Sequence, residues 1–211
     1  TTTDTPHTPP NCAAAMGLAV VSEAYLDSTL INIPGTTHLV RFRHRFLLQA
    51  DPGNVGFDGG ALEIAIGPGD YQDIIAAGGE FLAGGYTRTI SNQTDSLIGG
   101  RPAWSGDSGG YLSTSVRLPP STLDSTIRLR FRLSYDNDTG GGVWAIDSLD
   151  VVDECVFQDA EPPAVFCPAN ITRLTPHDIC APNQITLGDV TALATITDNC
   201  PNPLVVTQDP P

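Results

Sequence analysis

The sequence GDSGG at residues 106–110 contains the residue types that could most directly do chemistry. It reproduces the sequence around the nucleophile of chymotrypsin-like proteases, in which a serine attacks a carbonyl carbon while a histidine removes its proton. Only 107 residues precede Ser108, too few for the usual double barrel, and no histidine has the expected sequence context. We therefore expect GDSGG to be a glycine-rich turn between strands, and we expect no enzymatic activity.

Carboxylates beside turns are a second candidate for chemistry. Calcium binds six to eight oxygens, including carboxylates and the carbonyls of turns. Asp58 in FDGG and Asp147 in AIDS supply both kinds of ligand. The alternative is that these carboxylates are solvated and make Asx turns without a metal. The spacing alone leaves both alternatives open.

Aromatic side chains are a third candidate, because their faces can stack on sugars. The residues that could form such a platform are Tyr71, Tyr86, Trp104, Tyr111 and Trp144. Aromatic residues make up only 7% of the chain. We therefore favour core packing for the two tryptophans over a glycan site.

Net charge narrows the range of partners. The chain carries −14 at neutral pH, with ten basic residues, none of them lysine, against twenty-four acidic ones. Such a surface repels phosphate backbones and anionic lipids, so we expect no nucleic-acid binding. No apolar run approaches the length of a membrane span, so we expect no membrane insertion.

Composition and periodicity predict an all-β protein. Only 16% of residues are charged, and 21 glycines and 18 prolines supply many turns. Residues 37–49 and 126–135 alternate apolar and basic side chains with the period of a strand. Because these two segments hold six of the ten arginines, we expect their outer faces to lie side by side against carboxylates. The other predicted strands are residues 18–23, 61–67, 86–90, 111–118 and 143–152.

The cysteine pattern favours an oxidising compartment. There is no CxxC or cysteine–histidine cluster, so disulfides fit better than zinc, and the odd number leaves one thiol over. The cysteines are Cys12, Cys155, Cys167, Cys180 and Cys200. Three glycosylation sequons begin at Asn92, Asn137 and Asn170. Residues 1–11 form a Thr/Pro-rich arm that reads as extended or glycosylated, with acceptor candidates Thr1, Thr2, Thr3, Thr5 and Thr8.

Residues 12–153 resemble the MAM-type jelly-roll modules of bacterial secreted and surface proteins. The matching segments are FDGGALEIAIG at 57–67, GGYTRTI at 84–90, IGGRPAWSGDSGGY at 98–111 and RLRFRLSYDNDTGGGVWAIDSLDVVD at 128–153. The resemblance implies an antiparallel jelly roll that serves as an accessory or recognition module. It also implies a disulfide between Cys12 and Cys155, and a structural calcium ion at Asp58 and Asp147, with Asp136 as an additional ligand.

Residues 162–211 resemble the opening of a hyalin-repeat (HYR) module, an immunoglobulin-like sandwich common in extracellular proteins. The matching segments are PPAVFCPANIT at 162–172 and ATITDNC at 194–200. The resemblance implies that Cys180 pairs with Cys200 and that Cys167 is unpaired or bonds to another molecule. It also implies that the module is incomplete at residue 211, so that its missing strands come either from residues beyond 211 or from a neighbouring molecule.

These observations predict an arm at 1–11, a jelly-roll domain at 12–157 and a partial immunoglobulin-like domain at 158–211. We expect a secreted or cell-surface structural protein that assembles with copies of itself into an extracellular fibre by sharing strands. The arm would lie along a neighbouring copy. The alternative function is a glycan-binding, adhesive accessory module of a larger secreted protein.

Overall fold

The computed structural model describes residues 6–17, 20–138, 142–154, 164–166 and 195–197. The chain divides into two compact units, Thr1–Glu154 and Cys155–Pro211. We call them the sandwich unit and the C-terminal unit, and each is described by itself. No helix in the described part of the chain is long and apolar enough to cross a membrane.

The first sheet of the sandwich unit has the strand order β1, β14, β4, β12 and β8, and the short β11 also pairs with β4. All of these pairings are antiparallel. The strands are β1 (Ala13–Met16), β14 (Val143–Asp153), β4 (His38–Leu48), β12 (Leu112–Arg117), β8 (Glu80–Ala83) and β11 (Gly106–Asp107). The long pairing of β4 with β14 has one irregularity, between Asp147 and Asp150.

The second sheet has the order β2, β13, β6 and β7, with β3 also paired to β13, and it is antiparallel throughout. Its strands are β2 (Ser22–Asp27), β13 (Ser125–Tyr135), β6 (Gly59–Ile66), β7 (Gln72–Asp73) and β3 (Ile31–Ile33). A small third sheet joins β10 (Pro102–Ala103), β9 (Arg88–Ile90) and β5 (Val55–Gly56). A 3-10 turn, Pro120–Thr122, precedes β13.

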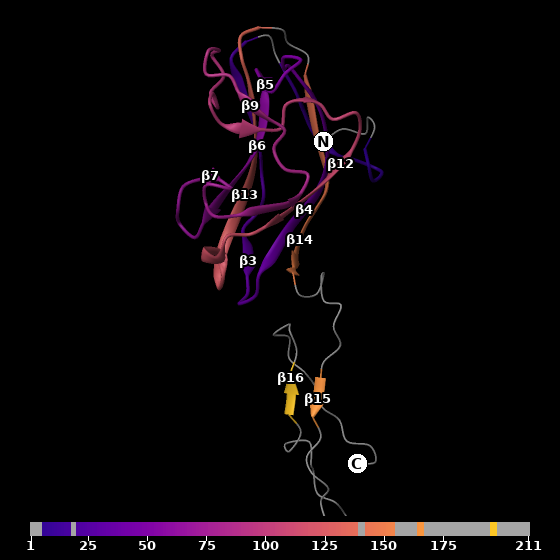
Figure 1. Ribbon diagram of the computed structural model, residues 1–211, viewed down its shortest axis with the longest axis vertical. Coiled ribbons are helices and arrows are strands. Elements are labelled where there is room, and N and C mark those ends of the chain that lie inside the picture. The colour runs from indigo at the N-terminus through magenta and orange to yellow at the C-terminus, as the bar shows by residue number, and fades with distance from the viewer. Residues whose placement is uncertain (1–5, 18–19, 139–141, 155–163, 167–194, 198–211) are drawn as a thin grey trace, which may run out of the picture. The chain divides into compact units, whose positions relative to one another are not determined.

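The two large sheets share one apolar core, and Figure 1 shows them as separate layers. Phe42 of β4 and Phe131 of β13 are both buried, and their ring centroids lie 5.0 Å apart. Alternate residues of a strand point to opposite faces, so the intervening arginines face outward. The predicted all-β class and the predicted alternation in β4 and β13 are confirmed, and the arrangement is that of a β-sandwich.

The predicted arrangement of the arginine faces is wrong. β4 and β13 belong to different sheets and pack through their apolar faces, so their arginines point to opposite sides of the sandwich. Carboxylates from the same sheet do pair with those of β13. Arg130 Nε and Nη2 donate to Asp27 at 2.8 Å each, and Arg132 Nε donates to Glu23 at 2.6 Å.

Several short elements differ from the prediction. The strand expected at 18–23 is β2, which begins at Ser22 and continues to Asp27. The other short strands of the sandwich unit were not predicted: β1, β3, β5, β7, β8, β10 and β11. They have few residues, and their apolar side chains do not alternate with polar ones over a length that periodicity can detect.

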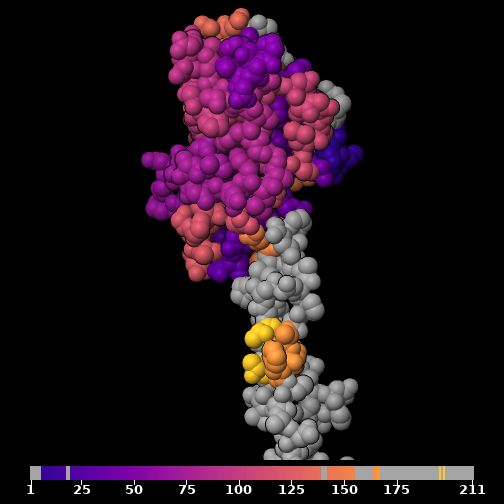
Figure 2. All heavy atoms as spheres, viewed as in Figure 1, coloured from indigo at the N-terminus to yellow at the C-terminus, as the bar shows by residue number. Residues whose placement is uncertain are grey.

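The described residues of the C-terminal unit form one antiparallel pair, β15 (Ala164–Phe166) with β16 (Thr195–Thr197). β15 lies within PPAVFCPANIT and β16 within ATITDNC. All three residues of β15 are exposed, and Val165 and Phe166 are 56% and 62% accessible. Atoms of β15 are visible at the surface in Figure 2.

Candidate functional site

Ser108 of the GDSGG segment is held by backbone groups. Its hydroxyl oxygen accepts the Phe46 N–H at 2.9 Å and lies 2.8 Å from the Gly110 carbonyl oxygen, to which it can donate. Gly109 and Gly110 have φ values of 66° and 153°, which favour glycine. Gly106 and Asp107 of the segment form β11, which pairs with β4, and residues 108–110 form the glycine-rich turn that follows it.

His44 lies in the core, in a chain of hydrogen bonds between strands. Trp144 Nε1–H donates to His44 Nδ1 at 3.1 Å, so the ring proton belongs on Nε2, which lies 2.9 Å from Thr114 Oγ1. Thr114 Oγ1 then donates to the Gly84 carbonyl oxygen at 2.8 Å. Every member of this chain is satisfied with a neutral imidazole. Burial lowers the pKa of His44 to about 4.

The two tryptophans are core residues. Trp104 is fully buried and Trp144 is 3% exposed, and their ring centroids lie 5.8 Å apart. Trp104 Nε1–H reaches the carbonyl oxygens of Gly84 and Gly85 at 2.9 Å each. Tyr86 donates its hydroxyl to Asp73, and Tyr71 stacks on the Arg130 guanidinium. The core alternative for the tryptophans is confirmed.

The structure brings Asp58 and Asp136 together. Asp58 Oδ1 accepts the Asp136 N–H at 3.0 Å, and Asp136 Oδ1 accepts the Asp138 N–H at 2.9 Å. Asp58 and Asp136 are only 2% and 4% exposed. The Gln49 carbonyl oxygen accepts the Asp58 N–H at 3.1 Å, which positions this corner against the end of β4.

Asp147 lies elsewhere, so the expected site shared by Asp58 and Asp147 is corrected. Asp147 stands opposite Arg43 on β4, six residues before Gln49, which corresponds to about 20 Å along a strand. Its Oδ2 accepts the Thr8 N–H at 2.9 Å. Thr8 also contacts Ser148, so the described part of the arm lies on the chain's own β14.

A polar hollow of about 470 Å³ adjoins the Asp58–Asp136 corner. Its lining residues are Gln49, Phe57, Gln93, Thr94, Asp95, Asp136, Asn137 and Asp138. Asn137 Nδ2 donates to Asp95 Oδ2 at 2.6 Å, and Gln49 Nε2 lies 3.5 Å from Asp138 Oδ2. Gln49 Oε1 is buried and has no hydrogen-bond partner among the residues that the structure describes.

The electrostatics of this corner favour a positive ligand. Burial raises the pKa of Asp58 to about 6. Hydrogen bonds to Asp58 lower this pKa, and the nearby charges of Asp136 and Asp138 raise it, but each of these effects is smaller than that of burial. No basic side chain is among the described residues that line the hollow. A divalent cation would offset the repulsion, and Gln49 Oε1 is an oxygen that could accept it.

The fit to calcium is partial. Within the described ranges, no three His, Cys, Asp or Glu side chains form a group that could hold a metal. Asp136 and Gln49 both line the hollow, and Asp58 accepts the Asp136 N–H. A bound ion would therefore need oxygens from water or from a rearranged Asp138 to reach six ligands.

The cysteines and sequons are only partly described. Cys12 is 3% exposed and precedes β1, which pairs with β14 at Val143–Ile146, whereas Glu154 lies past the opposite end of β14. Asn92 and Asn137 are exposed, as glycosylation requires. The predicted residues outside the described part of the chain are Cys155, Cys167, Cys180, Cys200, Asn170, Thr1, Thr2, Thr3 and Thr5.

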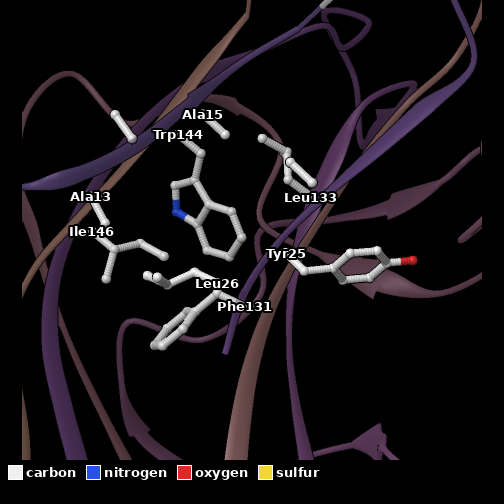
Figure 3. A pocket seen from close by; sticks show the side chains of 10 residues that line it. Ala13, Ala15, Tyr25, Leu26, Phe131, Leu133, Trp144 and Ile146 are labelled. Atoms are coloured by element: carbon white, nitrogen blue, oxygen red, sulfur yellow. The ribbon is translucent and has the colours of Figure 1, made fainter. Parts of the chain in front are cut away.

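An apolar cleft opens between β1 and β2, the edge strands of the two large sheets (Figure 3). Its volume is about 230 Å³. Alanines of β1 line one side, Ala24 and Leu26 of β2 the other, and the side chains of Phe131, Leu133, Trp144 and Ile146 surround the space. The sequence did not predict this cleft, because β1 has no recognisable strand pattern.

Comparison with known proteins adds no relative. No family model matches the chain, and no curated protein matches it.

Proposed function

We propose that this chain is a non-catalytic structural protein of the extracellular space or cell surface that assembles with copies of itself. The observation that carries the proposal is β15, an apolar strand whose three residues are all exposed. A two-stranded pair is marginally stable in water unless further strands or a packing surface cover it. Among the described residues, β15 pairs only with β16.

Electrostatics support a contact through apolar strands. The net charge of −14 disfavours association of copies through most of the surface. A neutral, exposed strand offers backbone hydrogen bonds and apolar side chains to a neighbour without that repulsion. We propose a fibre as the product, because a head-to-tail contact that does not close continues indefinitely.

The proposal also includes the module families, the disulfides, the calcium ion and the glycans. The sandwich unit would be a MAM-type jelly roll and the C-terminal unit an HYR-type module, stabilised by disulfides in an oxidising compartment. Calcium would bind at the polar hollow beside Asp58 and Asp136. Glycans would attach at the exposed sequons and on the Thr/Pro arm.

The test is the mass of the purified full chain over a range of concentrations. Light scattering after gel filtration, with negative-stain images, should show polymers that grow with concentration. Phe166→Asp should remove them, because it places a charge on the exposed face of β15. Asn54→Asp adds the same charge at an exposed loop position and should leave assembly unchanged. A wild-type chain that stays monomeric at every concentration would contradict the proposal.

The second candidate function is glycan binding at the polar hollow. The observation that favours it is the combination of Phe57 with amide and carboxylate side chains around one cavity, since such groups bind sugar hydroxyls and stack on sugar rings. Binding to a glycan array that Gln93→Ala abolishes, without loss of folding, would support this function. Trp104 is unsuitable for such a test because it is buried in the core.

A further inference from the structure

The apolar cleft offers an acceptor for an added strand. β1 is the last strand of the first sheet and β2 the last of the second, and no described strand pairs with the outer edge of either. A strand placed beside β1 would extend the first sheet, and its alternate side chains would point between the two sheets. The cleft there is about 230 Å³ and has an apolar lining, so it can take an apolar side chain.

β1 lacks the features that normally protect an edge strand. Proteins block exposed edges with charges, prolines or bulges. β1 is Ala-Ala-Ala-Met and pairs with β14 in continuous register. The small alanines also allow the backbone of a neighbour to approach closely. The edge of β2, in contrast, carries Glu23 and Asp27, which bind arginines of β13.

Exposed apolar side chains surround this edge. Met16 at the end of β1 is 72% exposed, and Leu26 of β2 is 39% exposed. Tyr25 is half exposed and its ring points away from the Trp144 indole (Figure 3). Val20 and Val21, between the two strands, are 53% and 38% exposed. The patch therefore continues from the cleft onto the surface around it, as at a protein interaction site.

We propose that β15 of one copy adds to the free edge of β1 in the next copy and places an apolar side chain in the cleft. This inference rests on the proposed assembly and names its two surfaces. β15 matches the acceptor in chemistry, because it is neutral, apolar and exposed at all three positions. The strands at the opposite ends of the two large sheets, β8 and β7, carry Glu80 and Asp73.

Because side chains alternate along a strand, each residue of β15 can be assigned to one of its two faces. Ala164 and Phe166 share one face and Val165 has the other. Phe166 enters the cleft beside Phe131 and Trp144, where aromatic edges and faces can meet. Val165 then lies on the outer face near Met16. β15 has three residues and β1 has four, so β15 can pair along most of β1.

Complementation between two blocked variants tests the pairing. Met16→Glu blocks the acceptor edge and is tolerated by folding because Met16 is exposed, and Phe166→Asp blocks the donor. Each variant alone should be monomeric. An equimolar mixture should form dimers, because the intact β15 of the first variant can join the intact β1 edge of the second. Leu97→Glu, which charges an apolar side chain that is 56% exposed elsewhere, should leave the wild-type polymer unchanged.

Each other outcome is decisive. Polymers of Met16→Glu, with monomers of Phe166→Asp, would overturn the β1 assignment and leave the proposed assembly intact. A monomeric wild type would overturn both. Wild-type monomers whose melting temperature falls in both variants would show that β15 docks on its own chain. Circular dichroism of each variant confirms that a loss of mass is not a loss of fold.

Discussion

Two buried titratable groups lie in contrasting surroundings. His44 in the core has a hydrogen-bond partner for each ring nitrogen in its neutral form, and burial lowers its pKa to about 4. Asp58 beside the polar hollow is also buried, and burial raises its pKa to about 6, with smaller contributions in the same direction from the charges of Asp136 and Asp138. The His44 network has all its hydrogen bonds without a ligand, whereas the surroundings of Asp58 favour binding of a proton or a cation.

The contrast separates structural from binding polar groups. A buried network in which every donor has an acceptor stabilises one packing of the core and needs no ligand. A buried carboxylate among other carboxylates costs stability at neutral pH, and such a cost is a feature of functional sites. This is why the polar hollow, rather than the histidine, is the place to look for a ligand.

The largest expected loss of stability follows from disrupting the hydrogen-bond chain at His44. His44→Ala should lower the free energy of unfolding by about 3–4 kcal/mol, because it leaves a cavity and removes the acceptor of Trp144 Nε1–H. Urea denaturation followed by tryptophan fluorescence measures the loss. Arg43→Ala, on the exposed face of the same strand, should change stability by less than about 0.5 kcal/mol. Equal losses in the two variants would contradict the role of the hydrogen-bond chain.

The pH dependence of stability compares the two groups directly. The pKa of His44 is lower in the folded state, so its contribution is present above pH 6.5 and is lost as pH falls toward 4, by about 3 kcal/mol. The pKa of Asp58 is higher in the folded state, so its contribution is present below pH 3.8 and is lost as pH rises through 6, by a similar amount of about 3 kcal/mol. The two slopes oppose each other, and their sum in the wild type should vary little between pH 4 and 6.5.

The variant Asp58→Asn separates the effects of His44 and Asp58 on the pH dependence of stability. Asparagine keeps an oxygen for the Asp136 N–H but does not titrate, so the slope of His44 should appear alone. Stability of the variant should then fall steadily as pH is lowered from 6.5 to 4, and it should exceed that of the wild type at pH 7. Denaturation curves at half-unit pH intervals measure this. A variant with the same flat profile as the wild type would refute the opposing assignments.

Calcium should stabilise the protein by binding at the Asp58–Asp136 corner, whereas the His44 network needs no ligand. At pH 7.5, Ca²⁺ at 100 times its dissociation constant stabilises a protein by about 2.7 kcal/mol if it binds only the folded state. The melting temperature should rise with calcium and return with chelator. Asp58→Asn and Asp136→Asn should lose most of this rise, and Asp147→Asn should keep it. An equal rise in all three variants would place the ion elsewhere.

The smallest expected change in stability comes from Ser108, whose hydroxyl lies outside both the His44 network and the Asp58–Asp136 corner. Ser108→Ala removes the hydroxyl that joins the GDSGG turn to Phe46 and should cost about 1 kcal/mol. The turn lies at the surface, so water can replace the lost bonds. Labelling of the wild-type chain by a serine-directed fluorophosphonate would instead point to an activated nucleophile.

The sequence predicted what depends on local pattern. Strict alternation over eleven residues identified β4 and β13 with nearly correct ends. The low aromatic content and the resemblance to jelly-roll modules favoured core packing for Trp104 and Trp144, and both are buried. GDSGG was recognised as a turn because the histidine context of a protease is absent.

The rest depends on long-range pairing that no local pattern contains. Asp58 and Asp136 are 78 residues apart, and only the pairing of β6 with β13 brings them together. Asp147 fits a calcium ligand equally well in sequence, but β14 places it against the arm. β4 and β13 look alike, and sheet membership alone decides that their arginines face opposite sides.

The bonds at Glu154 decide where a mechanical load would be carried. Arg117 Nε lies 3.0 and 2.9 Å from the two oxygens of the Glu154 carboxylate, and the Glu154 N–H donates to the Thr37 carbonyl oxygen at 2.8 Å. Tension applied beyond this residue is thus shared with β12 and with the start of β4 before β14 can peel away. In the proposed fibre, the sandwich would therefore act as a stiff link under strain.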